Sequence, residues 1–394
     1  MNDEFYCPQP WTGGYFTAEK QSVCCSHSGI KNPSPIDFLK SDHVKEIKQR
    51  LMTGNLDNDC SRCRKDEANG LVSLRQTLTS IQKYRNIDFI KDIDADSIPK
   101  AIEVKFSNLC NFKCRMCTPP WSNLIDKEFK ENPQLGKWYQ GSVLLQKDIG
   151  HQLASENFVK EITSFLPNLK WLNITGGEPM LAPEFLQLLD IIKTEGYTSS
   201  IGLHITTNCS TINPNFINVI NDFEKVHFSL SLDGIEDVAE YQRHGTNWKK
   251  VSDNVLYYCN LMSKNDKISI NSNTVISAYT VLDLARVTSY LVDLHNRFGI
   301  SLTYNIVFDY LNPLVLVGEL RERAKKEVQR SIDIIGNIES LYSSKSQLES
   351  LQNMLYDKPE NREDFENFVN FTKELDAIRN EDFNQIFGLN SLTH

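Results

Sequence analysis

The chain has 394 residues, 40% of them apolar, and a formal net charge of −9. This length allows one large domain or a medium-sized domain with additions, and no apolar run reaches the roughly 18 residues that a membrane helix needs. The acidic balance argues against nucleic acid as a partner, and the acidic start at Met1 to Glu4 is unlike a signal peptide. We therefore expect a cytoplasmic protein with no membrane contact.

Half of the ten cysteines lie in the first 65 residues, at Cys7, Cys24, Cys25, Cys60 and Cys63. In a chain without an export signal, cysteines point to metal or redox chemistry more than to disulfides. A CxxC pair with two single cysteines supplies four ligands, and both zinc and an iron–sulfur cluster fit that count. We predict a metal-binding module over residues 1–78 and a linker helix over residues 79–99.

From about residue 100 the chain alternates strand-like and helix-like stretches. An amphipathic helix is expected at 183–194, for example, where Phe185, Leu188 and Leu189 share one side. Such alternation predicts an α/β fold with a parallel sheet. The expected strands, most of them rich in β-branched or aromatic residues, are 102–106, 171–175, 201–206, 226–232, 268–275 and 302–308.

Six strand–helix units are fewer than the eight of a closed barrel. We therefore expect a partial (β/α)6 TIM-like barrel over residues 100–316. The remaining residues, 317–394, are charged and helical in pattern, so we expect a C-terminal helical extension that packs outside the barrel or between domains.

The central cysteines, Cys110, Cys114 and Cys117, directly follow the first expected strand with CxxxCxxC spacing. Three thiolates on one loop can hold three corners of a [4Fe–4S] cluster and leave the fourth iron open. The alternative is a structural zinc knuckle, which also uses closely spaced cysteines.

Further polar motifs follow the other expected strands, at the end where parallel α/β folds place their active sites. For each of these residues the alternative is a turn or a helix cap. The motifs are Gly176-Gly177-Glu178-Pro179 after the second strand, Thr207 and Asn208 after the third, Ser231 and Asp233 at the fourth, and then Arg243.

Taken together, the cysteine loop and these motifs resemble radical S-adenosylmethionine (SAM) enzymes. The resemblance implies that the open iron binds the amino and carboxylate groups of SAM, and that an injected electron then generates a 5′-deoxyadenosyl radical. It implies that residues 176–179 bind the SAM amino group, that residues 207, 208, 231 and 233 contact its ribose and carboxylate, and that Arg243 pairs with the carboxylate. Met116 stands where the family usually has an aromatic residue, beside the adenine.

The N-terminal cysteines resemble the auxiliary-cluster module called twitch, a shortened SPASM domain. The resemblance implies a second [4Fe–4S] cluster on Cys7, Cys24, Cys60 and Cys63, with Cys25 as the alternative to Cys24, and a role in electron transfer. Two features depart from the pattern: the module precedes the barrel, and Glu19 replaces a glycine. The tail residues Leu375, Asp376, Arg379 and Phe383 also resemble this subset.

The resemblance implies an oxidoreductase-type radical enzyme served by an electron donor such as flavodoxin or ferredoxin. A peptide or protein is the leading substrate, with a small molecule such as an amino acid, sugar or nucleotide derivative as the enzyme alternative. The non-enzyme alternative is an iron–sulfur or zinc scaffold. Cys209 replaces a glycine that is common after Thr-Thr-Asn, and we consider two roles for it: donor of a hydrogen atom to a substrate radical, or simply a small packed residue.

Overall fold

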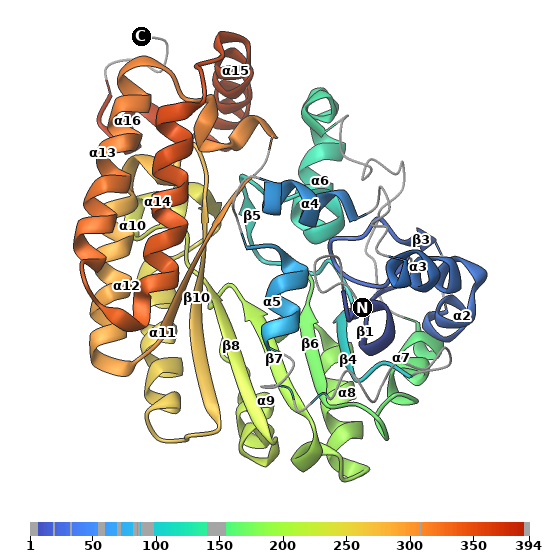
Figure 1. Cartoon of the computed structure of the whole chain (residues 1–394). Helices are drawn as coiled ribbons and strands as arrows, with labels where there is room; N and C mark the ends of the chain where they lie inside the picture. Colours follow the sequence, from blue (N-terminus) through green and yellow to red (C-terminus); the bar gives the residue numbers. More distant parts are fainter. Residues whose placement is uncertain are drawn as a thin grey trace. The chain divides into compact units, whose positions relative to one another are not determined.

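The structure is a computed structural model, shown in Figure 1. It describes residues 7–18, 20–31, 34–53, 60–68, 72–81, 85, 87, 98–139, 155–307 and 309–389. The chain divides into two compact units. The first contains residues 1–109, 151–206 and 213–227, and the second contains residues 110–150, 207–212 and 228–394.

The first unit is built on a mixed sheet in the order β7-β6-β4-β1-β2-β3. Its parallel part runs from β7 to β1, and β2 and β3 add to it in antiparallel fashion. The strands are β1 (Gly13–Thr17), β2 (Lys20–Ser22), β3 (Ile30–Lys31), β4 (Ala101–Lys105), β6 (Trp171–Thr175) and β7 (Gly202–Thr207).

Alternation along the parallel strands sorts their side chains onto two faces. On one face, Ile102, Leu172 and Leu203 are fully buried. On the other face, a row of polar side chains lies in register across four strands, because Tyr15 pairs with Glu103, Glu103 with Asn173 and Asn173 with His204. The first face is the hydrophobic core of this unit, and the second carries polar side chains that are themselves buried or half-buried.

Helices of the first unit are mostly short. The longest, α8, begins with Pro183 in its first turn, a position that suits proline, and it buries Phe185, Leu188 and Ile192. The helices are α1 (Gln9–Thr12), α2 (Pro35–Lys40), α3 (Asp42–Met52), α4 (Ser61–Ala68), α5 (Leu74–Ile81), α7 (Glu156–Thr163), α8 (Pro183–Thr194) and α9 (Pro214–Val219).

The second unit carries strands in the order β11-β10-β8 and a separate two-stranded ribbon of β5 and β9. In the ribbon, Lys113 pairs with His244 and Cys114 with Arg243. The strands are β5 (Lys113–Cys114), β8 (Lys225–Ser231, whose first three residues belong to the first unit), β9 (Arg243–His244), β10 (Ile268–Ile276) and β11 (Ser301–Ile306).

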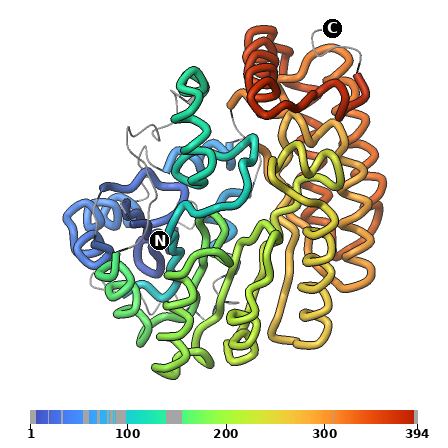
Figure 2. The backbone as a smooth tube through the Cα atoms, turned by 180° about the vertical axis from the view of Figure 1, so that it is seen from behind, coloured from blue at the N-terminus to red at the C-terminus, as the bar shows by residue number. Residues whose placement is uncertain are grey.

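Long helices make up the rest of the second unit. Helices α12, α13 and α14 contact one another in sequence, and Figures 1 and 2 show them side by side from opposite directions. The helices are α6 (Asn123–Glu131), α10 (Glu236–Gln242), α11 (Trp248–Met262), α12 (Leu284–Phe298), α13 (Gly318–Ile335), α14 (Tyr342–Asp357), α15 (Arg362–Arg379) and α16 (Phe383–Phe387).

The predicted α/β fold is confirmed, and each of the six expected strands is present with ends that differ by at most two residues. Helices also fill most of 317–389, as the charged pattern indicated. Most of the expected linker helix at 79–99 lies outside the described residues. Within the described part of the chain, no helix is both long enough and apolar enough to cross a membrane.

Candidate functional site

The loop of Cys110, Cys114 and Cys117 is held by its own backbone and by side chains of the second unit. The Cys110 N–H donates to Asn123 Oδ1 at 2.8 Å, and the Phe112 N–H donates to Cys110 Sγ at 3.5 Å. The Cys117 N–H returns to the Cys114 carbonyl at 3.0 Å. These bonds fold the loop tightly and bring a backbone donor to one of the three sulfurs.

The three thiols of this loop influence one another. Burial raises the pKa of Cys117, and the nearby Cys114 and Cys110 raise it further. Burial also raises the pKa of Cys114, while the Arg243 guanidinium, with Nη1 3.7 Å from Cys114 Sγ, opposes the shift. Three thiolates so arranged need a compensating positive centre, because like charges in a buried site disfavour ionisation. An iron–sulfur cluster provides such a centre.

A hollow beside this loop contains several of the polar residues expected to bind SAM. Asp233 is buried, accepts a bond from the Val275 N–H at 2.9 Å, and forms an ion pair with Arg243 at 2.7 Å. The hollow is lined by Phe112, Asn208, Ser231, Leu232, Asp233, Gly234, Ala239, Arg243, Thr246, Trp248 and Val251. The second unit therefore brings Asn208, Ser231, Asp233 and Arg243 together, whereas Met116 is half-buried and does not line the hollow.

Residues 207–209, which include the hollow residue Asn208, form a turn with a strained backbone at Cys209. Cys209 has φ of +60° and is fully buried, and its N–H donates to Thr207 Oγ1 at 3.1 Å. The Cys209 carbonyl accepts a bond from Asn254 at 2.7 Å. A left-handed backbone favours glycine, which explains why glycine is common at this position. The Cys209 thiol donates to the Thr207 carbonyl at 3.9 Å.

In the first unit, the Gly176–Pro179 segment forms a tight turn, and its predicted contact with the SAM amino group stays a prediction. Gly176 has φ of +138°, and a side chain on Gly177 would stand 2.0 Å from the Leu109 carbonyl oxygen. The Glu178 N–H donates to that same oxygen at 2.7 Å. The two glycines are therefore required by the local backbone, and Glu178 caps the short helix that starts at Pro179.

Three of the N-terminal cysteines lie near one another in the first unit. The thiols of Cys7 and Cys63 raise the pKa of Cys24, which burial already raises, to about 12. Burial and Cys63 likewise raise the pKa of Cys7 to about 11. Cys63 lies inside α4, and Cys60 immediately precedes that helix.

Cys25 points elsewhere. Its thiol donates a hydrogen bond to Glu103, whose carboxyl pKa is raised by burial.

Helix α4 is anchored to α5 by a two-point ion pair between Glu67 and Arg75, at 2.6 and 2.7 Å. Among the residues that the structure describes, no three His, Cys, Asp or Glu side chains converge closely enough to hold a single metal ion.

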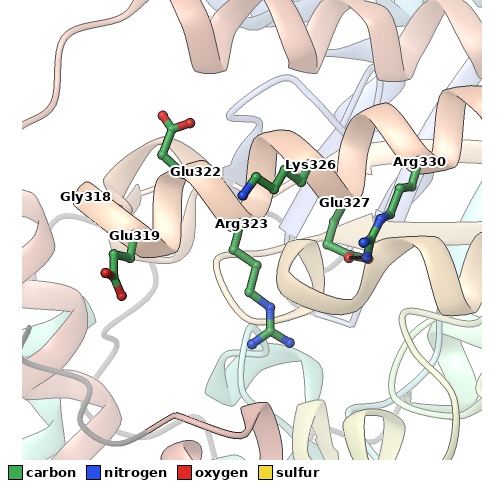
Figure 3. A pocket seen from close by; sticks show the side chains of 7 residues that line it. All are labelled: Gly318, Glu319, Glu322, Arg323, Lys326, Glu327 and Arg330. Atoms are coloured by element: carbon green, nitrogen blue, oxygen red, sulfur yellow. Dashed lines mark hydrogen bonds and ion pairs between the residues drawn. The ribbon is translucent and has the colours of Figure 1, made fainter.

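A separate hollow runs along α13 (Figure 3) and contains no residue that the sequence predicted for the site. Arg323 points away from the helix and donates to the carbonyls of Leu282 and Phe387, at 3.0 and 2.6 Å. Glu327 pairs with Arg330 at 2.8 Å. With acidic and basic side chains interspersed, this surface has no charge preference that would identify a ligand.

The surroundings of the cysteine loop were not predicted from the sequence. Phe112 and Trp248 line the hollow without having been predicted. Arg115, between two of the predicted ligands, is fully buried and points to the C-terminal helices. The available signal was the place of this arginine between two predicted cysteine ligands. A buried arginine needs acidic partners, so carboxylates from elsewhere in the chain could have been expected near the loop.

Comparison with known proteins gives one family match and several distant relatives. Residues 104–276 match the Radical SAM superfamily. The 7-carboxy-7-deazaguanine synthase of Clostridium acetobutylicum is 23% identical over 260 residues, which cover 64% of this chain and 94% of that protein.

Similarity to solved structures is weak. The structure of anSMEcpe with bound AdoMet is 18% identical with a TM-score of 0.40, covering 60% of this chain and 59% of that one. The radical SAM methyltransferase TsrM from Kitasatospora setae, with cobalamin and a [4Fe–4S] cluster bound, is 11% identical with a TM-score of 0.37, covering 56% and 36%. SuiB from Streptococcus suis, bound to its precursor peptide SuiA, is 14% identical with a TM-score of 0.33, covering 80% and 78%.

Residues 104–276 form a radical SAM domain within an α/β fold consistent with a partial TIM barrel. The chain carries this domain and is an enzyme. A radical SAM domain implies a [4Fe–4S] cluster, SAM, a reductant and a substrate, and it implies SAM cleavage followed by radical chemistry.

Proposed function

We propose that Cys110, Cys114 and Cys117 bind the [4Fe–4S] cluster that activates SAM. The observation that carries the proposal is the tightly folded loop, in which Cys114 and Cys110 raise the pKa of the buried Cys117 thiol and the Arg243 guanidinium lies 3.7 Å from Cys114 Sγ. When bound, the cluster and SAM supply an electron and a 5′-deoxyadenosyl radical that removes a hydrogen atom from the substrate. The chain itself binds and orients both and excludes water.

SAM recognition is assigned to the polar hollow and the glycine turn. Arg243 offers a planar donor fork that suits the SAM carboxylate, and its ion pair with Asp233 holds that fork in place. Asn208 and Ser231 offer an amide and a hydroxyl on the same lining. The backbone of Gly176, Gly177, Glu178 and Pro179, with Thr207 and the Met116 backbone, completes the proposed SAM-binding set.

A second cluster is proposed at the N-terminal cysteines, with Cys7, Cys24, Cys60 and Cys63 as ligands. The effects of Cys63 on the pKa of Cys7, and of Cys7 and Cys63 on the pKa of Cys24, support this grouping. The hydrogen bond from Cys25 to Glu103 favours Cys24 over Cys25 as the ligand. With four ligands the cluster has no open iron, so its role is to transfer electrons. A four-cysteine zinc site with a structural role is the alternative.

A donor role for Cys209 stays a hypothesis. Its buried thiol is bonded to a backbone carbonyl, which favours the packed-residue alternative. Unchanged turnover and product in a Cys209→Ala variant would exclude the donor role.

The proposed substrate is a peptide or protein, because the N-terminal cysteines and the tail resemble relatives that modify peptides. A small-molecule substrate is the second candidate, and one observation favours it: the similarity to a 7-carboxy-7-deazaguanine synthase over 94% of that protein's length. In either case a flavodoxin or ferredoxin is proposed as the electron donor.

The test separates radical chemistry from substrate class. Reconstituted protein reduced with dithionite is expected to release 5′-deoxyadenosine from SAM, and a Cys110→Ala/Cys114→Ala/Cys117→Ala variant is expected to release none. Peptide and small-molecule fractions of host cells grown in D2O are then added separately. Deuterium in the 5′-deoxyadenosine identifies the fraction that holds the substrate. Cleavage that persists in the triple variant would refute the assignment of the loop.

A further inference from the structure

Both neighbours of Cys114 in the chain carry positive charges that are paired inside the second unit. Arg115 has no exposed side-chain surface, and its guanidinium contacts the carboxylates of Asp376 and Glu381. Its Nε donates to the Tyr241 carbonyl at 3.0 Å, and the Tyr241 ring centroid lies 3.5 Å from its Cζ. Arg115 is therefore enclosed by partners from α10, α15 and the segment that follows α15.

On the other side of Cys114, Lys113 pairs with Glu128 of α6 at 2.7 Å. The same carboxylate receives two bonds from Arg379, at 3.1 and 2.7 Å. The side chains of Glu128 and Arg379 are almost fully buried, at 4% and 1% exposure. This second contact therefore links the loop to the last residue of α15.

The two contacts share one helix end. Asp376 and Arg379 lie three residues apart on α15, so they occupy neighbouring positions on its surface. Asp376 also accepts bonds from the Tyr241 hydroxyl at 2.9 Å and from the Phe383 N–H at 2.9 Å. Glu381 accepts a second partner, His244 Nδ1, at 2.6 Å. His244 pairs with Lys113 across the β5–β9 ribbon.

Stability alone is a poor explanation for this network. Burying charges costs several kcal/mol per ion, and apolar side chains of similar size often serve as well or better. A buried ion network does, however, define one geometry, because removing either partner leaves an uncompensated charge. Here the geometry defined is that of the backbone on both sides of Cys114.

We propose that Asp376, Arg379 and Glu381 are positioning residues that brace the cysteine loop through Arg115 and the Lys113–Glu128 pair. The C-terminal helices thereby hold Cys114 in the orientation it needs to bind iron. The inference rests on the proposed function only in taking the loop as the place where the cluster binds.

The first test uses protein without a cluster. Cys114 is buried, so its alkylation requires local opening of the loop. In the Asp376→Asn/Glu381→Gln variant, the alkylation rate of Cys114, followed by mass spectrometry, is expected to rise about tenfold or more. Cys259, fully buried in α11, reports global unfolding and is expected to keep its rate. Glu366→Gln, at an exposed pair on the same helix α15, is the matched control and should behave as wild type.

Two outcomes would overturn the proposal. One is an unchanged Cys114 rate, and the other is an equal rise at Cys259, which would mean that the network stabilises the unit as a whole. The conservative Arg379→Lys variant keeps the charge but loses the two-point bond to Glu128, and it should give an intermediate Cys114 rate. If Cys114 is alkylated in Arg379→Lys at the same rate as in wild type, Arg379 is not one of the positioning residues.

A second readout uses the loaded protein. The SAM-dependent change in the electron paramagnetic resonance spectrum of the reduced cluster is expected to differ in the double variant and to be unaltered in Glu366→Gln. Identical spectra in the double variant and wild type would contradict the brace. If the wild-type loop itself fails to bind iron, the proposed function fails, whereas the alkylation rates still decide the brace.

Discussion

At the residue scale, Gly177 stands where the backbone of the first unit leaves no room for a side chain. A Cβ there would meet the Leu109 carbonyl oxygen at 2.0 Å. We expect Gly177→Ala to lower the free energy of unfolding by about 1–3 kcal/mol, as overpacking does, and to weaken SAM binding at least tenfold. Thermal unfolding and equilibrium dialysis with SAM would measure the two effects.

Gly136 supplies the control for that substitution. A Cβ at this position would meet nothing within 4 Å. Gly136→Ala should change the free energy of unfolding by less than about 0.5 kcal/mol, as most surface substitutions do, and leave SAM binding unaltered. Equal effects at the two glycines would show that the close approach at Gly177 has no consequence for binding.

Neighbouring cysteines provide a second prediction at this scale. Because Cys24 faces Cys7 and Cys63 while Cys25 faces Glu103, Cys24→Ser should lose about four irons per chain after reconstitution and Cys25→Ser should lose none. Iron counting against protein concentration measures both. Loss of iron only in Cys25→Ser would reverse the ligand assignment.

Sequence spacing ranked Cys24 ahead of Cys25, but it had no access to the contact between Cys25 and Glu103. These two residues are 78 positions apart in the chain, and the fold brings them within hydrogen-bond reach. Arg115 is a similar case, since its carboxylate partners lie more than 260 positions away. Local patterns identify candidate residues, whereas the long-range fold decides what each side chain meets.

At the element scale, Asp283 marks the start of α12. Burial raises its pKa to about 6, helped by Glu327 and Asp237, although Arg286 acts in the opposite direction. An acid whose pKa is raised in the folded state stabilises the fold below its unfolded pKa, near 4. That contribution is lost as the pH rises through about 6.

We therefore expect Asp283→Asn to stabilise the protein at pH 7 and to have little effect at pH 4. The gain is about 1 kcal/mol, less than the full shift implies, because partial exposure screens the charge. Thermal melts at the two pH values would measure it. Asp293→Asn, at an exposed pair on the same helix, is the control and should show no such difference. A loss of stability at pH 7 in Asp283→Asn would contradict the account.

Elements differ in how well the sequence predicts them. Helix α8 has regular apolar spacing and was predicted over the same residues that it occupies. Strands β2 and β3 and the β5–β9 ribbon were not predicted, because two or three residues are too few to show a period. Strand β1 was not predicted either, since it lies in the stretch that was interpreted as a metal-binding module. The ribbon matters for function, since it places Cys114 opposite Arg243.

At the scale of the whole molecule, the chain is an α/β protein with a radical SAM domain, for which we propose two iron–sulfur clusters of different function. The alternation of strands and helices was enough to predict the α/β fold, because most of the six strands are short runs rich in β-branched or aromatic residues. The substrate could not be predicted, since the residues that contact it are set by loop and side-chain geometry rather than by a motif.

We propose that the loop at 110–117 and the N-terminal cysteines each hold an iron–sulfur cluster, and the first measurement to make is an iron count after anaerobic reconstitution. The account predicts about eight irons per wild-type chain and about four in Cys110→Ala/Cys114→Ala/Cys117→Ala, which should cleave no SAM. About four irons in the wild type, with zinc bound and no iron in the triple variant, would contradict the second cluster. A full complement of iron with no SAM cleavage by the wild-type protein would contradict the account of the loop itself.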